Sequence, residues 1–527
     1  MNGASFVPAD APGHALAPGS IAAIFGTFDI SAPTWASGFP LPTSLGGASV
    51  TFNGKPAPLF YVSSTQINAE VPGDTAAGTE YSAYGSASVV VTVAGHSSAP
   101  VGADVLPVNP MLFTQGGSGC GAGAVLNMAS DGSVSVNSAS DSASPGDFIE
   151  VYGTGLGGTA PPAEDGEPAP SNPLSKPAVY GASALFDAAT VPMNAIPYAV
   201  ALAPVAFAGR APGFAGVDQY NVQIPPGVRE GCSVPVRIVS NYVEAESQPV
   251  LVSIHTGGGP CADPPVWGYG EIVIKKSVIL NDPKTPETDT FSARFPASPG
   301  LVLPTPLPAN GQVVVEAVPR SPRCPIPGHK TLSAGPIVVT NPQGVPVQVQ
   351  PTIASDGSVS YSATLPAGFV QPGTYRLAAA GAGVGSFQAS LTAGADISVT
   401  SQYPAGSTVG AATGNVLYPV NWTGGEAGEA ATLRVDSDQF VSDSVWLVRV
   451  PAAAGTVGIP VSYLGGVPGQ SQGVQYPQVP TSLPGTFEIR VDVGPDPSKI
   501  PTFTAPGLTL GGRAFVVYEY RFTGLNN

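Results

Sequence analysis

The amino-acid sequence predicts an all-β fold made of tandem immunoglobulin-like β-sandwiches, and three observations lead to this class. Short apolar runs such as Val89–Val93 are separated by turn residues, as expected for strands. Gly (66) and Pro (59) account for almost a quarter of the 527 residues, which suits a chain in which every short strand ends in a turn. Two motifs also occur twice in the same order, which indicates a duplicated structural unit.

The duplicated motifs define the first half of the chain. PGSIAAIFGT at Pro18–Thr27 returns as PGDFIEVYGT at Pro145–Thr154. QINAEVP at Gln66–Pro72 returns as QYNVQIP at Gln219–Pro225. We therefore expect two copies of one sandwich, residues 1–107 with an N-terminal extension and residues 108–256.

The first copy contains a regular series of short strand signals. The dipeptide Asn53-Gly54 follows an alternating segment and predicts a tight hairpin turn. We expect strands at residues 21–25, 48–52, 59–62, 89–93 and 101–105. No helical periodicity of useful length competes with them.

The second copy also has turn residues between its strand signals, and it contains one insertion. Ser130–Ser133 (SDGS) predicts a hairpin turn, and the Pro-rich Pro161–Pro173 predicts an exposed loop. A third sandwich is expected at 257–394, where Ser355–Ser358 repeats the SDGS turn, and a fourth at 395–527. The alternating run Ala514–Phe522 at the end of the fourth is typical of a strand with one solvated face.

Composition and charge exclude several classes of function. Charged residues are only 10% of the chain, and the net charge is −16 with the basic residues scattered. A nucleic acid needs a positive surface, so nucleic acid is not an expected partner. No apolar stretch is long enough to insert into a membrane. No signal peptide is visible, so if the protein is exported we expect its signal peptide to have been removed.

The four cysteines predict disulfides and therefore an oxidising, extracellular compartment. Their wide spacings and the absence of CxxC argue against a zinc site. Of three possible pairings, we expect Cys120–Cys232 and Cys261–Cys324, because each bond then stays inside one predicted domain. Four free thiols are the alternative.

Two motifs with catalytic spacing have simpler explanations. Gly153–Gly158 fits GxGxxG, but no helix follows to hold a pyrophosphate, so we expect a strand-ending turn. Gly469–Gly473 fits GxSxG within a Gly/Pro/Gln loop, where chance is the better explanation. With four isolated histidines, we expect no catalytic residue, cofactor or metal site.

The recurring amides and the tryptophans are the candidate binding residues. Gln66/Asn68 and Gln219/Asn221 could face a ligand, or could bond backbone groups at a sheet edge; their recurrence favours the structural alternative. Trp422 and Trp446 lie in strand-like runs and are expected in cores. Trp35 and Trp267 lie in predicted loops and are the candidate ligand-facing aromatics.

The ordered blocks in residues 15–254 resemble a known family. PGS…IFGT, LPTSLGGASVTFNGKPAPLFYVSSTQINAEVP, PGDFIEVYGTGLG and DQYNVQIPPGV are similar to the uncharacterised Solibacter-type C-terminal domain of Acidobacteria. The resemblance implies IPT/TIG-like sandwiches and a surface location, and it brings no established activity or catalytic residues. Here the blocks are N-terminal rather than C-terminal, and about 270 further residues follow.

We therefore expect a non-catalytic exported or cell-surface protein with a structural or adhesive role. A specific version is self-assembly into an extracellular fibre or layer through edge strands, with Met1–Pro18 as an intermolecular strand. The partners would be further copies of the chain, surface glycans or proteins. The alternative function is an extracellular carbohydrate-binding protein that uses Trp35 or Trp267.

Overall fold

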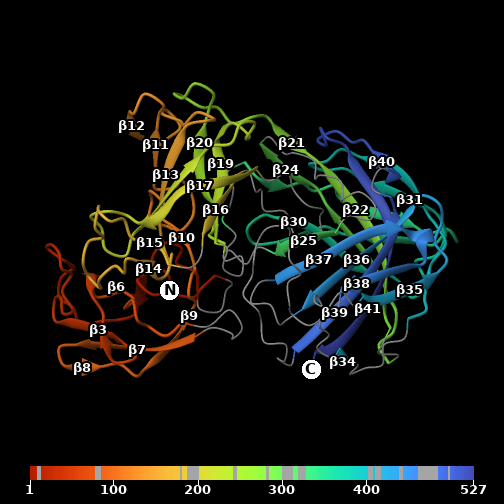
Figure 1. Ribbon diagram of the computed structural model, residues 1–527. Helices are drawn as coiled ribbons and strands as arrows, with labels where there is room; N and C mark the ends of the chain where they lie inside the picture. The colour runs from red at the N-terminus through yellow and green to blue at the C-terminus, as the bar shows by residue number, and fades with distance from the viewer. Residues whose placement is uncertain are drawn as a thin grey trace. The chain divides into compact units, whose positions relative to one another are not determined.

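The computed structural model describes residues 1–527 except 9–12, 78–84, 179–180, 187–200, 241–245, 281–283, 300–312, 319–323, 325–327, 402–407, 410–416, 438–442, 461–484, 497–498 and 527. The chain divides into two compact units (Figure 1). The first comprises Met1–Pro192, Ala199–Pro264 and Pro319–Pro327, and the second comprises Met193–Tyr198, Pro265–Val318 and Gly328–Asn527. The described residues form strands and one short 3-10 helix, Ala452–Ala454, which confirms the predicted all-β class.

The first sandwich packs a four-stranded sheet and a five-stranded sheet around one apolar core. The four-stranded sheet has the order β1 (Ile21–Phe25), β6 (Gln66–Glu70), β5 (Leu59–Val62), β2 (Thr34–Trp35). The other sheet has the order β4 (Lys55–Pro56), β3 (Ala48–Phe52), β7 (Gly85–Val93), β8 (His96–Ser97), with β9 (Val101–Val105) also on β7. All five strands predicted for this copy are present.

The second sandwich is a nine-stranded sheet around a core of its own. Its central strand β17 pairs with β16 through its first half and with β18 through its second, with a register shift between Val205 and Phe207. The strands are β10 (Met111–Leu112), β11 (Val125–Met128), β12 (Val134–Val136), β13 (Phe148–Thr154), β16 (Ala182–Phe186), β17 (Ala201–Arg210), β18 (Asp218–Gln223), β19 (Gly231–Ser240) and β20 (Val250–Ile254). The ribbon β14 (Thr159–Ala160) and β15 (Lys176–Pro177) flanks the Pro-rich loop.

The second unit is built on one eleven-stranded sheet. Its strands are β25 (Val313–Val318), β37 (Asp443–Pro451), β36 (Glu429–Ser437), β39 (Gly485–Pro495), β41 (Gly512–Asn526), β22 (Gly270–Ile279), β23 (Thr288–Arg294), β30 (Val359–Thr364) and β29 (Thr352–Ile353), with β34 (Thr408–Val409) and β40 (Thr502–Phe503) also on β41. Smaller sheets are β28 (Pro346–Val349), β27 (Ile337–Thr340), β31 (Gly373–Ala379), β32 (Phe387–Ala393); β33 (Ser398–Val399), β35 (Leu417–Thr423), β38 (Thr456–Pro460); and β21 (Val266–Gly268), β24 (Pro296–Pro299), β26 (Lys330–Thr331).

The large sheet crosses the boundary predicted at residues 394/395. β22, near the start of the predicted third domain, pairs in parallel with β41 at the end of the fourth. One apolar core contains buried side chains from Ile272 to Phe522. The predicted boundary therefore falls inside a continuous core, because strands distant in sequence supply the shared sheet.

The predicted hairpin turns are confirmed. Asn53 and Gly54 have φ of 50° and 84°, the left-handed conformation that a two-residue hairpin turn requires. In both SDGS turns the aspartate (Asp131 or Asp356) accepts a 2.8 Å hydrogen bond from the backbone N–H of the serine two residues later. These local signals fix where the strands reverse.

Candidate functional site

An amide pair lies on the outer face of the first sandwich. Nε2 of Gln66 donates to Oδ1 of Asn68 at 2.8 Å on strand β6. The alternate residues Ile67 and Ala69 are fully buried in the core. Because successive side chains of a strand point to opposite faces, both amides lie on the face away from the core.

Three aromatic residues flank the amide pair on the same face. Residues directly opposite each other in an antiparallel pair share a face, and the register places Trp35 opposite Tyr61 and Tyr61 opposite Asn68. Phe25 lies opposite Gln66 on the other side. Trp35 is 68% exposed and Phe25 50% exposed. We call Phe25, Trp35, Tyr61, Gln66 and Asn68 the aromatic–amide face.

The two rings at the β2 end of this face lie against each other. The ring centroids of Trp35 and Tyr61 are 4.4 Å apart at an interplanar angle of 44°. At the other end, Phe25 is in edge contact with Phe6 at 6.1 Å. These contacts hold the exposed rings in place, so the face has a defined shape.

The polar atoms of this face are only partly used. Among the described residues, Gln66 Nε2 donating to Asn68 Oδ1 is the side-chain hydrogen bond of the pair, and Nδ2 of Asn68 has no protein acceptor. Ala23, directly opposite Asn68 on β1, offers no polar side-chain atom. The face therefore presents free donors beside exposed rings.

The second copy contains the same amide pair, with a carboxylate bound to its glutamine. Nε2 of Gln219 donates to Oδ1 of Asn221 at 2.8 Å and lies 3.0 Å from Oε1 of Glu150. The hydroxyl of Tyr152 donates to Oε2 of Glu150 at 2.9 Å. Burial, and then Glu150, raises the pKa of Tyr152 to about 12, so this hydroxyl stays a donor at neutral pH.

The register shows which residues of the two copies correspond. Glu150 lies opposite Asn221 as Ala23 lies opposite Asn68. Tyr152 likewise takes the place of Phe25. The carboxylate that accepts from the glutamine in the second copy is thus missing from the first.

The recurring amides therefore bond each other, whereas the sequence-based structural alternative expected them to bond backbone groups. Both Trp35 and Trp267 were predicted in loops, but the structure places them in the short strands β2 and β21. Trp267 is 38% exposed and lies opposite Ser298. Phe25 and Tyr61 could not be assigned to the same face as Trp35 from the sequence, because only the strand register brings them together.

Trp422 and Trp446 were the two tryptophans expected in cores. Trp422 is buried, as predicted, and its Nε1 donates to the carbonyl of Ala452 at 2.7 Å. Trp446 lies in β37, but its side chain lies outside the described residues, and so does all of Gly469–Gly473.

The glycine-rich segment Gly153–Gly158 forms the predicted strand-ending turn, at the junction of the first two sandwiches. A Cβ on Gly155 would lie 2.0 Å from the carbonyl oxygen of Asn109, and one on Gly157 would lie 2.0 Å from that of Pro107. The backbone N–H of Leu156 donates to Asp218 at 2.7 Å. These glycines let the turn pack directly on the segment that connects the sandwiches.

A buried ion pair lies beneath this turn. Arg210 binds Asp218, and its second terminal nitrogen lies 3.2 Å from the carbonyl oxygens of Pro18 and Gly157. Burial raises the pKa of Asp218 to about 6, which leaves the carboxylate ionised at neutral pH beside the guanidinium. The pair therefore joins residues of both copies.

A second carboxylate serves the same junction. Glu70 of β6 accepts a 2.7 Å hydrogen bond from the backbone N–H of Gly166, in the Pro-rich loop of the second copy. The loop is largely exposed, as predicted, but Gly166 is buried. Burial raises the pKa of Glu70 to about 7.

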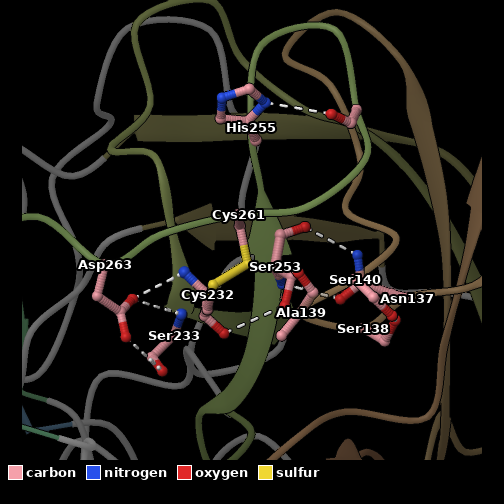
Figure 2. Close-up of a disulfide and its surroundings, with 11 residues drawn as sticks. Asn137, Ser138, Ala139, Ser140, Cys232, Ser233, Ser253, His255, Cys261 and Asp263 are labelled. Carbon is pink, nitrogen blue, oxygen red and sulfur yellow. Dashed lines mark hydrogen bonds between the residues drawn. A yellow bond between two sulfur atoms is a disulfide. The ribbon is translucent and has the colours of Figure 1, made fainter.

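All four cysteines form disulfides, but the predicted pairing is wrong. The bonds are Cys120–Cys324 and Cys232–Cys261. Pairing within predicted domains failed because Cys324 belongs to the first unit, although the strands before and after it in the sequence, β25 and β26, belong to the second. Beside the Cys232–Cys261 disulfide, Asp263 accepts hydrogen bonds from the backbone N–H groups of Cys232 (2.7 Å) and Ser233 (3.1 Å) (Figure 2).

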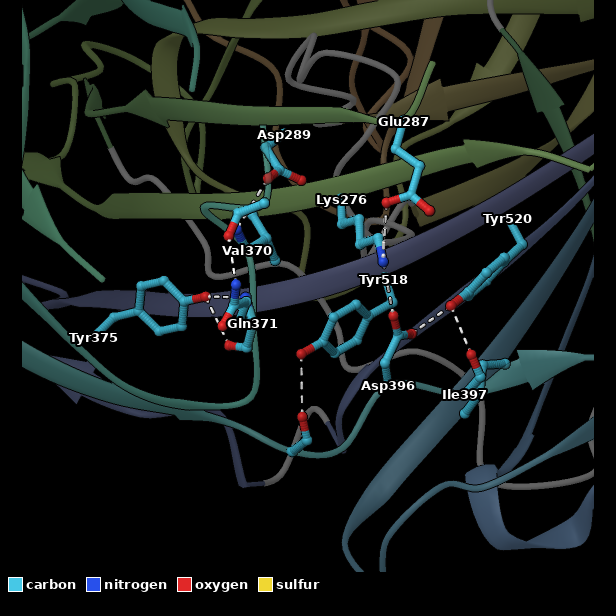
Figure 3. Close-up of polar contacts among 12 residues, drawn as sticks. Lys276, Glu287, Asp289, Val370, Gln371, Tyr375, Asp396, Ile397, Tyr518 and Tyr520 are labelled. Atoms are coloured by element: carbon cyan, nitrogen blue, oxygen red, sulfur yellow. Dashed lines mark hydrogen bonds and ion pairs between the residues drawn. The ribbon is translucent and has the colours of Figure 1, made fainter. Parts of the chain in front are cut away.

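A cluster of titratable groups in the second unit holds the segment that connects β32 to β33. Nζ of Lys276 lies 3.1 Å from Asp396 and 3.2 Å from Glu287 (Figure 3). The hydroxyl of Tyr520 bonds Asp396 and Ile397, and that of Tyr518 donates to Gly394 at 3.1 Å. Burial, and then Asp396, raises the pKa of Tyr520, so its hydroxyl remains a donor. The polar groups of the cluster therefore find their partners within the fold.

The described residues contain no group of three or more His, Cys, Asp or Glu side chains placed to hold a metal ion. They also contain no helix long and apolar enough to cross a membrane.

Comparisons with known proteins find only distant structural likeness. No protein-family model and no curated protein sequence matches the chain. Among solved structures, the chain is similar to a tetra-tandem repeat from the extending region of a large adhesion protein (12% identity, 95% of this chain and 98% of that chain, TM-score 0.13). It is also similar to domains 4–9 of the surface-layer protein SbsC (12% identity, 69% of this chain and 41% of that chain, TM-score 0.15). A third similar structure is that of domains FN1–FN3 of chicken CNTN1 (9% identity, 67% of this chain and 89% of that chain, TM-score 0.14).

Proposed function

We propose that this chain is a non-catalytic extracellular structural or adhesion protein that associates with further copies of itself through strand β12. Two disulfides support an oxidising compartment. The buried charges of the first unit, Arg210, Asp218 and Glu70, are used to join sandwiches. Such joints suit a protein whose task is to hold surfaces at a fixed geometry.

The observation that carries self-association is the edge strand β12, Val134–Val136. Among the described residues it pairs only with β11, so its other backbone edge is unpaired. Val134 and Val136 are 54% and 57% exposed. Natural edge strands are usually protected by short length, charge, proline or a bulge. β12 has only three residues, but its sequence Val-Ser-Val has neither a charge nor a proline.

The surface beside this edge is also apolar. Met128 and then Phe148 lie in the same cross-strand row as Val134, and Leu126 lies opposite Val136. A second β12 added in register would extend the sheet and cover these side chains. The edge thus offers both backbone hydrogen bonds and apolar burial.

The N-terminal segment is engaged within its own chain, in contrast to the intermolecular role expected from the sequence. The N–H of Gly3 donates to Ile21 at 2.8 Å, and that of Ala23 donates to Met1 at 2.9 Å. This pairing covers the edge of β1. It leaves β12 as the better candidate for contact between copies.

Sedimentation velocity over a wide range of protein concentration tests the proposal. We expect concentration-dependent oligomers of the full chain and a monomer for the double variant Val134→Lys/Val136→Lys. Ile353→Lys on the edge strand β29 is the matched control, since Ile353 is also exposed, and it should behave as wild type. A wild-type chain that stays monomeric throughout, or equal effects of both variants, would contradict it.

A further inference from the structure

We infer that the aromatic–amide face of the first sandwich binds a neutral carbohydrate. This inference deepens the proposed adhesive function by naming a ligand class, and it involves a different surface from β12. The inference depends on the difference between the two copies of the duplicated unit. In the second copy a carboxylate accepts from the glutamine of the amide pair. In the first copy no carboxylate lies at that place, and the amide pair lies beside exposed rings.

The ring faces supply the first element of recognition. Large aromatic side chains offer flat apolar area together with a polar handle, the indole N–H of Trp35 and the hydroxyl of Tyr61. A pyranose has an apolar face of C–H groups and a rim of hydroxyls. It can pack its C–H face on Trp35, the most exposed ring of the face, and keep its hydroxyls near polar groups.

The amide pair supplies the second element. An amide has two N–H donors and one carbonyl acceptor, which matches hydroxyls that both donate and accept. The bond from Gln66 to Asn68 orients both groups before any ligand arrives, so less freedom is lost on binding. In the second copy, Glu150 already binds Gln219, which removes the corresponding donor.

The dimensions and charge of the face favour an extended, uncharged ligand. From Trp35 on β2 to β1 the face spans three strand spacings, roughly 14 Å at about 4.8 Å each, enough for several sugar units in a row. None of its five residues is charged, and the chain carries a net charge of −16. That charge repels polyanions, so a neutral glycan is the fitting occupant.

A printed array of neutral and acidic glycans, probed with the full chain, tests this inference. We expect binding to neutral glycans, and then a loss of at least tenfold in affinity for Trp35→Ala and for Asn68→Ala, measured by titration calorimetry with the best neutral oligosaccharide. Trp267→Ala and Asn221→Ala are the matched controls and should stay within twofold of wild type. Thermal unfolding of each variant separates a lost contact from a lost fold, and Trp35→Phe should retain part of the affinity.

Three results would overturn the inference: no binding to any neutral glycan, a preference for sulphated or carboxylated glycans, or equal losses in the controls. The lysine variants of β12 should bind the same glycan as wild type. A failure here would therefore leave the self-association proposal standing, and a failure of self-association would leave this one standing.

Discussion

Nη1 of Arg210 lies 2.5 Å from Oδ1 of Asp218, and both side chains are buried where the two copies of the duplicated unit meet. Arg210 comes from β17 and Asp218 from the start of β18, directly opposite each other. Because Arg210 also reaches the carbonyl of Pro18, the ion pair connects the second copy to the first. The joint explains why the two sandwiches form one compact unit.

Removing one partner of this pair should be costly. Asp218→Ala leaves the guanidinium of Arg210 buried without its carboxylate and also removes the acceptor for the N–H of Leu156. We expect a loss of about 3–5 kcal/mol in the free energy of unfolding of the first unit. Chemical denaturation followed by circular dichroism measures it, and a loss below about 1 kcal/mol would show that the joint is unimportant.

The glycine turn above the pair gives a sharper test because it contains its own control. Gly155 has a φ of 110° and would place a Cβ 2.0 Å from the carbonyl oxygen of Asn109, so Gly155→Ala should destabilise by more than about 2 kcal/mol. Gly158→Ala meets no atom within 4 Å and should be nearly neutral. Equal melting temperatures for the two variants would contradict this account of the junction.

The buried Glu70 makes stability depend on pH in a predictable direction. Its pKa is raised from 4.5 to about 7, so the folded state holds the proton more tightly than the unfolded chain. Stability from this group is present below about pH 4.5 and is lost as the pH rises through about 7, by about 3 kcal/mol at most. Glu70→Gln, which keeps an acceptor for Gly166, should remove that part of the decline between pH 5 and 8. A pH profile of the variant parallel to that of wild type would count against it.

The two disulfides should differ in their contribution to stability. Cys120–Cys324 closes a separation of 204 residues and Cys232–Cys261 one of 29, so the entropic model assigns them about 5 and about 3.5 kcal/mol. The double variant Cys120→Ser/Cys324→Ser should therefore melt at a lower temperature than Cys232→Ser/Cys261→Ser. The opposite order would mean that the long loop is already restrained in the unfolded chain.

Local signals in the sequence were sufficient to predict the turns and most of the strands around them. Asn53-Gly54 and the SDGS turns act within four residues, and their backbone requirements leave few alternatives. The same holds for Gly153–Gly158, which the lack of a following helix pattern predicted to be a strand-ending turn.

Pairings between distant segments could not be predicted. The partner of Cys120 is Cys324, 204 residues away between two strands of the second unit, and nothing near either cysteine in the sequence indicates the pairing. The aromatic–amide face depends on the register of β2, β5, β6 and β1, which places Trp35 beside Tyr61 and Phe25 beside Gln66. The duplication did reveal the amide pair. The difference at the position opposite the asparagine, Ala23 in the first copy and Glu150 in the second, can be recognised only once the strands are paired.

Hydrogen–deuterium exchange at two protein concentrations tests the central claim, self-association through β12, most directly. The N–H of Ser135 points to β11, whereas the N–H groups of Val134 and Val136 point to the unpaired edge. If copies associate through this edge, the amides of Val134 and Val136 should exchange quickly in dilute solution and be protected at high concentration, while those of β29 exchange equally at both. Exchange of the Val134 and Val136 amides that does not change with concentration would contradict the account.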